Sequence, residues 1–360
     1  MSGKKWFNAF LIISLALMVL VGGMVFVIDP FFVYRAPNPK IYYKLYDQRS
    51  QNNGITKFFD YDAIITGTSM AENFKASDFD NSFGTHAAKV TYAGATFKEI
   101  NDNLKVAYES GHEVKYILRP IDYTLLTKDK DEMRTDMGEY PVWLTNDNPF
   151  DDVKYLLNRD VILSYAVPCL LNLIKGRQGG YTSFDEYSYN GDYNYSKAEV
   201  LAGRERFDEP SEVNPVDEEE LSRLRENFEQ NVISIAKEHP ETEFFCFLPP
   251  YSMAYWGGVK EDGDLDKMLV YTKEATALML QCDNIHVYSF NLETSVTENL
   301  DLYRDSGHYN PDINQWIITR IAEGEEAQGE SPYRLTLENY EEHYEKLTQL
   351  LKEYDYNQLF

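Results

Sequence analysis

A serine near the start of the chain and an aspartate–histidine pair near its end have the residue types of a nucleophilic catalytic site. Ser69 follows an apolar run and a glycine, and a serine at a turn from strand to helix presents its hydroxyl clear of the sheet edge. Asp305 and His308 are close enough in sequence for the carboxylate to fix the tautomer of the imidazole. We therefore predict that Ser69 is a nucleophile, that His308 is its general base, and that Asp305 orients His308.

Both motifs also have a simpler interpretation. A serine directly after a strand is more often a helix N-cap than a nucleophile, and an Asp-x-x-His segment can be an ordinary surface loop. The residues after His308 favour the catalytic interpretation, because Asn310 is a good N-cap and Pro311 suits the first position of a helix. His308 is then expected on a loop directly before a helix, where catalytic groups often lie.

The segments around these motifs alternate between strand-like and helix-like patterns. Helix starts are indicated by Thr96-x-x-Glu99 and Asp217-x-x-Glu220, and Thr336 could cap a terminal helix. The alternation predicts an α/β fold, a three-layer α/β/α sandwich with a parallel sheet. The turns at Ser69 and Gly94 follow the first two strands, so they are expected at one end of the sheet. Apolar strand-like runs are expected at residues 61–65, 88–93, 113–121, 242–248 and 285–290.

The order of the motifs resembles that of the SGNH (GDSL-like) hydrolase superfamily. The resemblance lies at Gly67-Thr68-Ser69, at Gly94 and at Asp305-x-x-His308. It implies the α/β/α fold and a Ser-His-Asp triad. It also implies that the backbone N–H groups of Ser69 and Gly94 form the oxyanion hole, where preorganised donors stabilise the developing charge.

One position departs from the pattern of this superfamily. The family usually supplies an asparagine side chain after its third strand, where this chain has Ile121-Asp122-Tyr123. An ionised Asp122 would oppose a developing oxyanion, so it is protonated, it points elsewhere, or the donor set is reduced. Asp122 is a candidate lining residue of the substrate pocket. Tyr251 is the second, because it follows the strand at 242–248 and ligands bind at the carboxyl ends of such strands; ordinary turn packing is the alternative.

The N-terminus predicts a membrane anchor. Residues 10–28 form a charge-free run of 19 residues, close to the length that spans a hydrocarbon core of about 30 Å. Lys4 and Lys5 precede the run and Asp29 follows it, so the positive-inside rule puts the N-terminus in the cytoplasm and the rest outside the cell. A cleaved signal peptide is the competing interpretation. No small-x-small cleavage site follows the run, which favours an uncleaved anchor.

The predicted organisation has four parts. Residues 1–29 are the cytoplasmic tip and anchor, 30–59 a stalk and irregular entry segment, and 60–330 the SGNH-like domain. The last part, 331–360, is a terminal helix that docks on the domain. Residues 125–215 break the α/β rhythm and are predicted to be an insertion or lid with one apolar helix at 161–174; a plain structural excursion is the alternative.

The composition of the chain argues against several classes of binding partner. The formal net charge of −25 argues against nucleic acid, and it disfavours tight binding of anionic lipid headgroups outside the basic N-terminus. The cysteines show no metal-ligand spacing, and neither a metal nor a cofactor is expected. Cys246 is predicted to pack in the core, and a disulfide between Cys169 and Cys282 stays open. The 28 tyrosines fit a saccharide groove or, more simply, core and interface packing.

The resemblance extends to a narrower group. An N-terminal anchor, an external SGNH-like domain, Gly-Thr-Ser-Met and the late Asp-x-Gly-His look similar to bacterial cell-surface acyl-transfer proteins of the teichoic-acid D-alanylation and alginate O-acetylation types. This implies transfer of an acetyl or D-alanyl group to a cell-envelope polysaccharide or teichoic acid, with a membrane-bound O-acyltransferase as partner. Two alternatives stay open: a secreted carbohydrate esterase with the same triad, and an inactive glycan-binding or scaffold protein.

Overall fold

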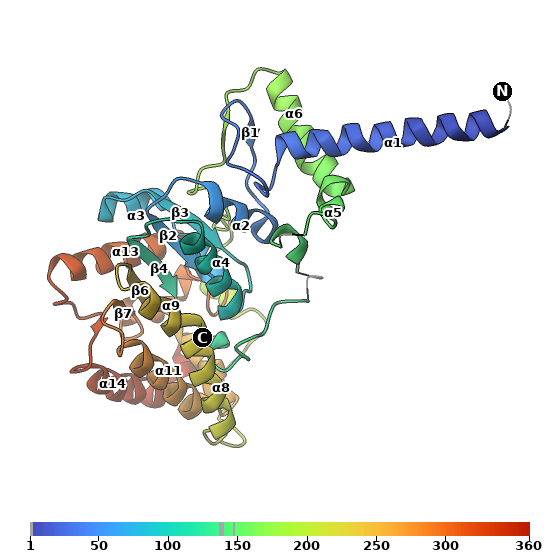
Figure 1. The fold of residues 1–360 in the computed structure, drawn as a ribbon. Coiled ribbons are helices and arrows are strands. Elements are labelled where there is room, and N and C mark those ends of the chain that lie inside the picture. Colours follow the sequence, from blue (N-terminus) through green and yellow to red (C-terminus); the bar gives the residue numbers. More distant parts are fainter. Residues whose placement is uncertain (1–2, 137–139, 147) are drawn as a thin grey trace. The chain divides into compact units, whose positions relative to one another are not determined.

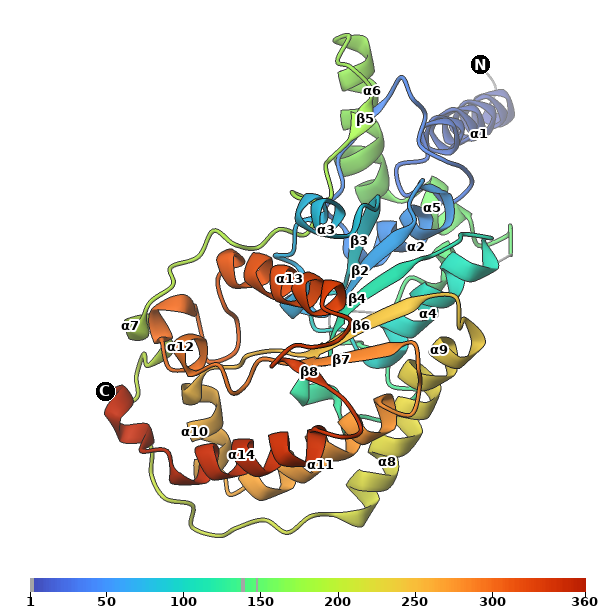
Figure 2. The same cartoon turned by 90° about the vertical axis from the view of Figure 1, so that its left-hand side faces the viewer.

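The computed structural model describes residues 3–136, 140–146 and 148–360. The chain forms two compact units, which are traced in Figures 1 and 2. Unit 1 combines residues 1–60 with 135–183, and unit 2 combines residues 61–134 with 184–360. The predicted insertion at 125–215 is therefore divided, since only its middle part belongs with the N-terminal residues.

Unit 2 is built on a mostly parallel six-stranded sheet of order β3-β2-β4-β6-β7-β8. Only β8 is antiparallel to its neighbour. Residues of β2 and β3 pair in register from Ala63 with Ala87 to Gly67 with Thr91, so the turns after both strands lie at one end of the sheet, as predicted. The five predicted strands are all present. The strands are β2 (Ala63–Gly67), β3 (Ala87–Thr91), β4 (Tyr116–Pro120), β6 (Glu243–Leu248), β7 (Ile285–Ser289) and β8 (Arg334–Leu335).

Three helices of unit 2 begin where the cap signals place them. Thr96 and Glu99 form a complete capping box at the start of α4, and Asp217 accepts a hydrogen bond from the Glu219 N–H at the start of α8. Asn310 caps the helix that opens with Pro311. The helices of unit 2 are α3 (Ala76–Phe83), α4 (Phe97–Glu109), α7 (Lys197–Val200), α8 (Glu218–Phe228), α9 (Ser234–Glu238), α10 (Met253–Glu261), α11 (Leu265–Met279), α12 (Thr294–Thr297), α13 (Pro311–Glu326) and α14 (Tyr340–Glu353).

The terminal helix begins later than predicted. Residue Thr336 was expected to cap it, but α14 starts at Tyr340, because residues 334–335 first pair with β7 as β8. Leu347 and Leu351 of α14 are buried, and the Tyr344 hydroxyl hydrogen-bonds the Thr276 hydroxyl of α11 at 2.8 Å. The helix therefore packs on the domain through α11.

Unit 1 contains the N-terminal helix α1 (Gly3–Ile28), which is long and apolar enough to cross a membrane. Two short strands, β1 (Tyr42–Tyr43) and β5 (Gly180–Tyr181), pair in parallel. The remaining helices are α2 (Gln48–Phe58), α5 (Val153–Leu156) and α6 (Val167–Ile174). A π-helical turn at Val161–Ala166 leads directly into α6, so the predicted helix at 161–174 is present. The wide turn accommodates Pro168, which has no N–H to donate.

Helix α2 was not predicted. Asn52-Asn53-Gly54 suggests a turn, yet Gly54 lies inside the helix. A Cβ at Gly54 would lie 2.2 Å from the carbonyl oxygen of Phe31, so the glycine allows two segments to approach closely rather than turning the chain.

All three cysteines are buried free thiols, which answers the open question about Cys169 and Cys282. Cys246 lies in β6, as expected of a core residue.

Candidate active site

The turn that carries Ser69 is tightly built. Strand β2 ends at Gly67, whose φ of +144° and whose closeness to the Pro120 ring leave no room for a side chain. Thr68 caps the 3₁₀ turn Ser69–Ala71, and its hydroxyl accepts a hydrogen bond from the Met70 N–H at 3.3 Å. The N-cap is therefore Thr68 and not Ser69. The predicted helix opening at Met70 is this single turn, and α3 begins only at Ala76.

The structure brings the three predicted catalytic residues together. Ser69 Oγ lies 2.8 Å from His308 Nε2, and His308 Nδ1 lies 2.8 Å from Asp305 Oδ2. The two contacts use opposite ring nitrogens, so a proton on Nδ1 leaves Nε2 free to accept the proton of Ser69. This is the relative geometry of nucleophile, general base and orienting carboxylate.

Backbone N–H groups of the loop before α13 hold the Asp305 carboxylate beside His308. Asp305 Oδ1 accepts hydrogen bonds from the backbone N–H groups of Gly307 at 2.9 Å and His308 at 2.8 Å. Burial raises the pKa of Asp305, but the interactions with the His308 side chain and with these two N–H groups outweigh burial. Together they lower the pKa from its ordinary value of 3.8 to about 2. Asp305 is therefore ionised at neutral pH and can stabilise an imidazolium. A bridge between Tyr303 and Tyr309 closes the base of the loop.

The two predicted oxyanion donors follow adjacent strands. Within the described residues, neither the Ser69 N–H nor the Gly94 N–H donates a hydrogen bond to the protein. Gly94 has a φ of +61°, and a Cβ there would collide with the guanidinium of Arg134. Arg134 Nη1 donates to the Ala93 carbonyl at 2.7 Å, so this side chain lies directly against the Gly94 turn. No local pattern in the sequence indicates a role for Arg134.

Asp122 has neighbours that occupy its carboxylate. Oδ1 accepts from the Thr124 N–H at 3.0 Å, the Thr124 hydroxyl at 2.8 Å and the Tyr251 hydroxyl at 3.0 Å. Oδ2 accepts from the Thr68 hydroxyl at 3.1 Å. Asp122 thus joins the turns after β2, β4 and β6. Of the three possibilities for this departure, these contacts favour the second: the Asp122 carboxylate points toward donors of the surrounding turns and acts as a structural acceptor.

The second predicted pocket residue, Tyr251, is also buried. Only 5% of Tyr251 is exposed, and its ring packs against the rings of Tyr123 and Tyr255 at centroid distances of 4.9 Å and 4.7 Å. Asp122 and Tyr251 are therefore buried residues that pack behind the turns of the site, and they do not line an open pocket. A cavity of about 380 Å³ does open beside Asp305, with Tyr255 and Phe207 among its lining residues.

Replacing Asp122 by alanine should destabilise unit 2. The Thr68 and Tyr251 hydroxyls would lose a buried acceptor, and each buried unsatisfied group costs about 1–3 kcal/mol. We expect a loss of about 2–4 kcal/mol in the free energy of unfolding, measured by urea denaturation. Asp283→Ala, at an exposed position, is the matched control and should change the stability little. Equal stability of the two variants would contradict the structural role of Asp122.

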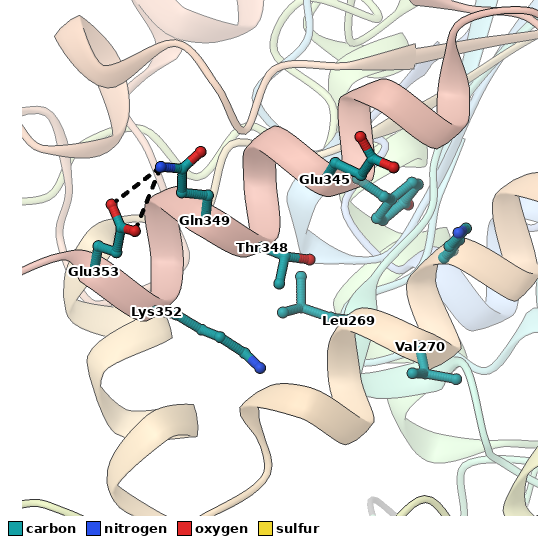
Figure 3. Close-up of a pocket in the computed structure, with 9 residues that line it drawn as sticks. Leu269, Val270, Glu345, Thr348, Gln349, Lys352 and Glu353 are labelled. Carbon is teal, nitrogen blue, oxygen red and sulfur yellow. Dashed lines mark hydrogen bonds between the residues drawn. The ribbon is translucent and has the colours of Figure 1, made fainter.

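A cavity of about 560 Å³ lies apart from the triad, between α11 and α14 (Figure 3). Leu269 and Val270 line it from α11, and Gln349 and Glu353, joined by hydrogen bonds, line it from α14. None of its lining residues belongs to the triad or to the two oxyanion turns. Within the described residues, no cluster of three or more metal-ligating side chains is present.

Asn190 and Arg304 link the segment after Ser69 to the Asp305 loop. The Asn190 N–H donates to Asn73 Oδ1 at 2.9 Å, and its side chain donates to Glu72 Oε2 at 3.2 Å. Arg304 stacks on the Tyr193 ring, and its Nε lies 3.6 Å from Asp305 Oδ2. Arg304 Nη1 also lies 3.4 Å from the Asn190 carbonyl oxygen, completing the link. Nothing local in the sequence marks either residue.

Lys89 supports the same segment from below. It lies in the middle of β3, is fully buried, and donates from Nζ to the carbonyls of Glu72 at 2.7 Å and Phe74 at 2.9 Å. These carbonyls follow the Ser69 turn, so Lys89 fixes the path of the chain after Ser69. A lysine inside the apolar run Ala87-Ala88-Lys89-Val90 is the signal that could have identified it.

Lys89 should also make stability depend on pH. Burial lowers the pKa of Lys89 to about 7, from an ordinary value of 10.5. Between these values the unfolded chain binds more protons than the folded chain, so stability should rise with pH. We expect the unfolding free energy of the natural chain, relative to Lys89→Met, to increase from pH 7 to pH 10 in denaturant titrations. A constant difference across this range would contradict the burial of a titrating amine.

Comparison of the chain with protein-family models, with curated proteins and with solved structures gave no match.

Proposed function

We propose that this chain is an extracytoplasmic serine acyltransferase of the SGNH type. It would place an acetyl or D-alanyl group on a cell-envelope polysaccharide or teichoic acid, anchored by α1 with its C-terminal domain outside the cell and served by a membrane-bound O-acyltransferase. The observation that carries the proposal is the hydrogen-bonded series Ser69–His308–Asp305. An N-cap serine needs no imidazole beside it, and the cap here is Thr68.

The sheet topology supports the assignment. In the order β3-β2-β4-β6-β7 the direction of winding reverses between β2 and β4, and ligands of doubly wound sheets bind at the carboxyl ends of strands at such a point. Ser69 follows β2 and Asp122 follows β4. We extend the observed α/β sheet to the three-layer sandwich of this superfamily as part of the same proposal.

The proposed reaction has two transfers. His308 Nε2 takes the Ser69 proton while Oγ bonds to the carbonyl carbon of the donor, and the N–H groups of Ser69 and Gly94 stabilise the oxyanion. The bond from the acyl carbon to the leaving group breaks, and His308 returns the proton to that group. An acceptor hydroxyl then loses its proton to His308, bonds to the acyl carbon and releases Ser69, which regains the proton.

The full chain in detergent, incubated with a fluorogenic acetyl ester, tests the proposal. Adding an acceptor glycan or lipoteichoic acid should yield acylated acceptor by mass spectrometry, with no product from Ser69→Ala. Release of fluorophore with no acylated acceptor would favour the carbohydrate esterase, which would use the same triad with water as acceptor. Binding of the acceptor without any turnover would leave the inactive glycan-binding or scaffold protein.

A further inference from the structure

Unit 1 exposes apolar side chains on a second helix besides α1. Leu171, Leu173 and Ile174, at the end of α6, are 46%, 42% and 71% exposed. Leu163, in the π-helical turn that leads into α6, is 55% exposed. A short helix of a water-facing domain does not normally leave four large aliphatic side chains in solvent.

The same helix is attached to the end of α1. The ring of Tyr165 packs edge-on against Phe31 at 4.6 Å, and the π-helical turn contacts α1 directly. The Tyr155 hydroxyl, from α5, donates to Asp29 Oδ1 at 3.0 Å. Figure 1 shows α5 and α6 crossing beside the C-terminal part of α1.

The length of α1 shows how deep in the membrane its contact with the chain around α5 and α6 would lie. If Lys4 and Lys5 lie at the cytoplasmic headgroups, Gly22 lies about 24 Å along the helix from Trp6, at about 1.5 Å per residue. A hydrocarbon core is about 30 Å thick, so Gly22 falls within its outer half. A Cβ on Gly22 would lie 3.4 Å from Leu157 Cδ2, and Gly22, Val25 and Ile28 are the buried residues of α1. The chain that covers them therefore reaches the outer leaflet.

The net charge of unit 1 is also compatible with contact to a membrane surface. Unit 1 carries 11 Lys and Arg against 9 Asp and Glu, a net charge of +2, whereas the whole chain has −25. The strong negative charge that disfavours contact with anionic headgroups thus belongs to unit 2. Lys175 and Arg177 follow α6 directly and are exposed, and within the described residues neither is paired with a carboxylate. The Arg177 guanidinium lies over the Tyr42 ring at 3.7 Å, an arrangement that leaves its charge without a counter-ion. Such residues place their charge among headgroup phosphates while their stems stay in the apolar region.

We propose that the helix at 161–174 inserts its exposed aliphatic side chains into the outer leaflet of the membrane that α1 spans, so that unit 1 contacts lipid at two places. The inference rests on the proposed placement of α1 in the membrane and is independent of the proposed chemistry. Leu163, Leu171, Leu173 and Ile174 face the acyl chains, and Lys175 and Arg177 face the phosphates. The partner is the phospholipid bilayer itself.

Spin labels on the full chain test this proposal. Leu171→Cys and Ile174→Cys carry the label on α6, Leu20→Cys on α1, and Val213→Cys and Leu337→Cys, which are 58% and 62% exposed in unit 2, serve as controls. The natural cysteines are buried, and the unsubstituted chain gives their background labelling. Each variant is reconstituted in vesicles of phosphatidylethanolamine and phosphatidylglycerol, and the accessibility of the label to oxygen and to a water-soluble nickel chelate is measured.

The α6 labels should resemble the α1 label. We expect the nickel chelate to relax the labels at positions 171 and 174 several-fold less than those at 213 and 337, with high accessibility to oxygen. Labels at 171 and 174 as open to nickel as the controls would overturn the proposal while leaving the triad untouched. Low accessibility to both reagents would mean that protein covers the helix, which also overturns it. A nickel-accessible label at position 20 would overturn the placement of α1 and this inference together.

Discussion

Replacing Ser69 by alanine should abolish esterase and acyl-transfer activity. In the proposed reaction the variant loses the atom that bonds to the acyl carbon, the Ser69 Oγ that contacts His308 Nε2. His308→Ala should cost as much, because serine is a weak nucleophile without a base to take its proton. We expect each variant to lose about a millionfold in kcat, with little further loss when the two changes are combined, because the two residues act as one unit.

Stability measurements distinguish lost chemistry from lost structure. The melting temperature of Ser69→Ala should stay close to that of the natural chain, because no other described contact depends on the Ser69 hydroxyl. His308→Ala also loses the contact with Asp305, but that carboxylate is half exposed and keeps the N–H groups of Gly307 and His308, so the melting temperature of this variant should fall little. Ser82→Ala, in α3, and His86→Ala, on the surface, are matched controls that should keep full activity. Full activity in Ser69→Ala would reject the catalytic assignment and leave the binding-protein alternative.

Asp305→Asn should give the second largest loss. The asparagine cannot supply the negative charge that stabilises the imidazolium, and its amide nitrogen can turn toward His308 and select the wrong tautomer. We expect kcat to fall by up to about ten-thousandfold while a measurable activity remains, because the nucleophile and the base are still present. The measurement is a comparison of initial rates with Asp312→Asn, an exposed position in the first turn of α13.

The pH dependence of Asp305→Asn offers an internal test. The Asp305 carboxylate is already ionised at neutral pH, since its pKa is about 2. An asparagine side chain gains no negative charge between pH 6 and 9, so raising the pH should not restore the variant to the rate of the natural chain. Rates for Asp305→Asn equal to those of the natural chain would show that His308 is oriented by other groups.

Local patterns in the sequence predicted the strands and the caps well. A capping box such as Thr96 with Glu99 depends on residues three apart, and a buried parallel strand needs only a short apolar run. The meeting of Ser69, His308 and Asp305 could be predicted because their two motifs are each recognisable locally and their order suggested the resemblance. The start of α14 was misplaced, because β8 pairs with a strand far away in sequence.

The parts that could not be predicted depend on contacts between distant residues. Lys89 bonds the carbonyl of Glu72, which lies 17 positions before it, and Asn190 bonds a residue 117 positions away. Gly54 looks like a turn residue unless the carbonyl of Phe31 is known to lie against it. Asp122 could be identified as unusual, but the hydroxyls of Thr68 and Tyr251 that occupy it come from separate turns.

The uneven charge of the chain has a kinetic consequence for the proposed acceptors. Unit 2, which holds the triad, carries a net charge of −27, because the chain has −25 and unit 1 has +2. A polyanionic acceptor such as an alginate or a teichoic acid without D-alanine is repelled by such a field before contact. Counter-ions shorten the range of the repulsion to about 10 Å at 0.1 M salt. Encounter with a polyanion should thus become faster as salt or magnesium is added, whereas encounter with an uncharged polymer should be indifferent to both.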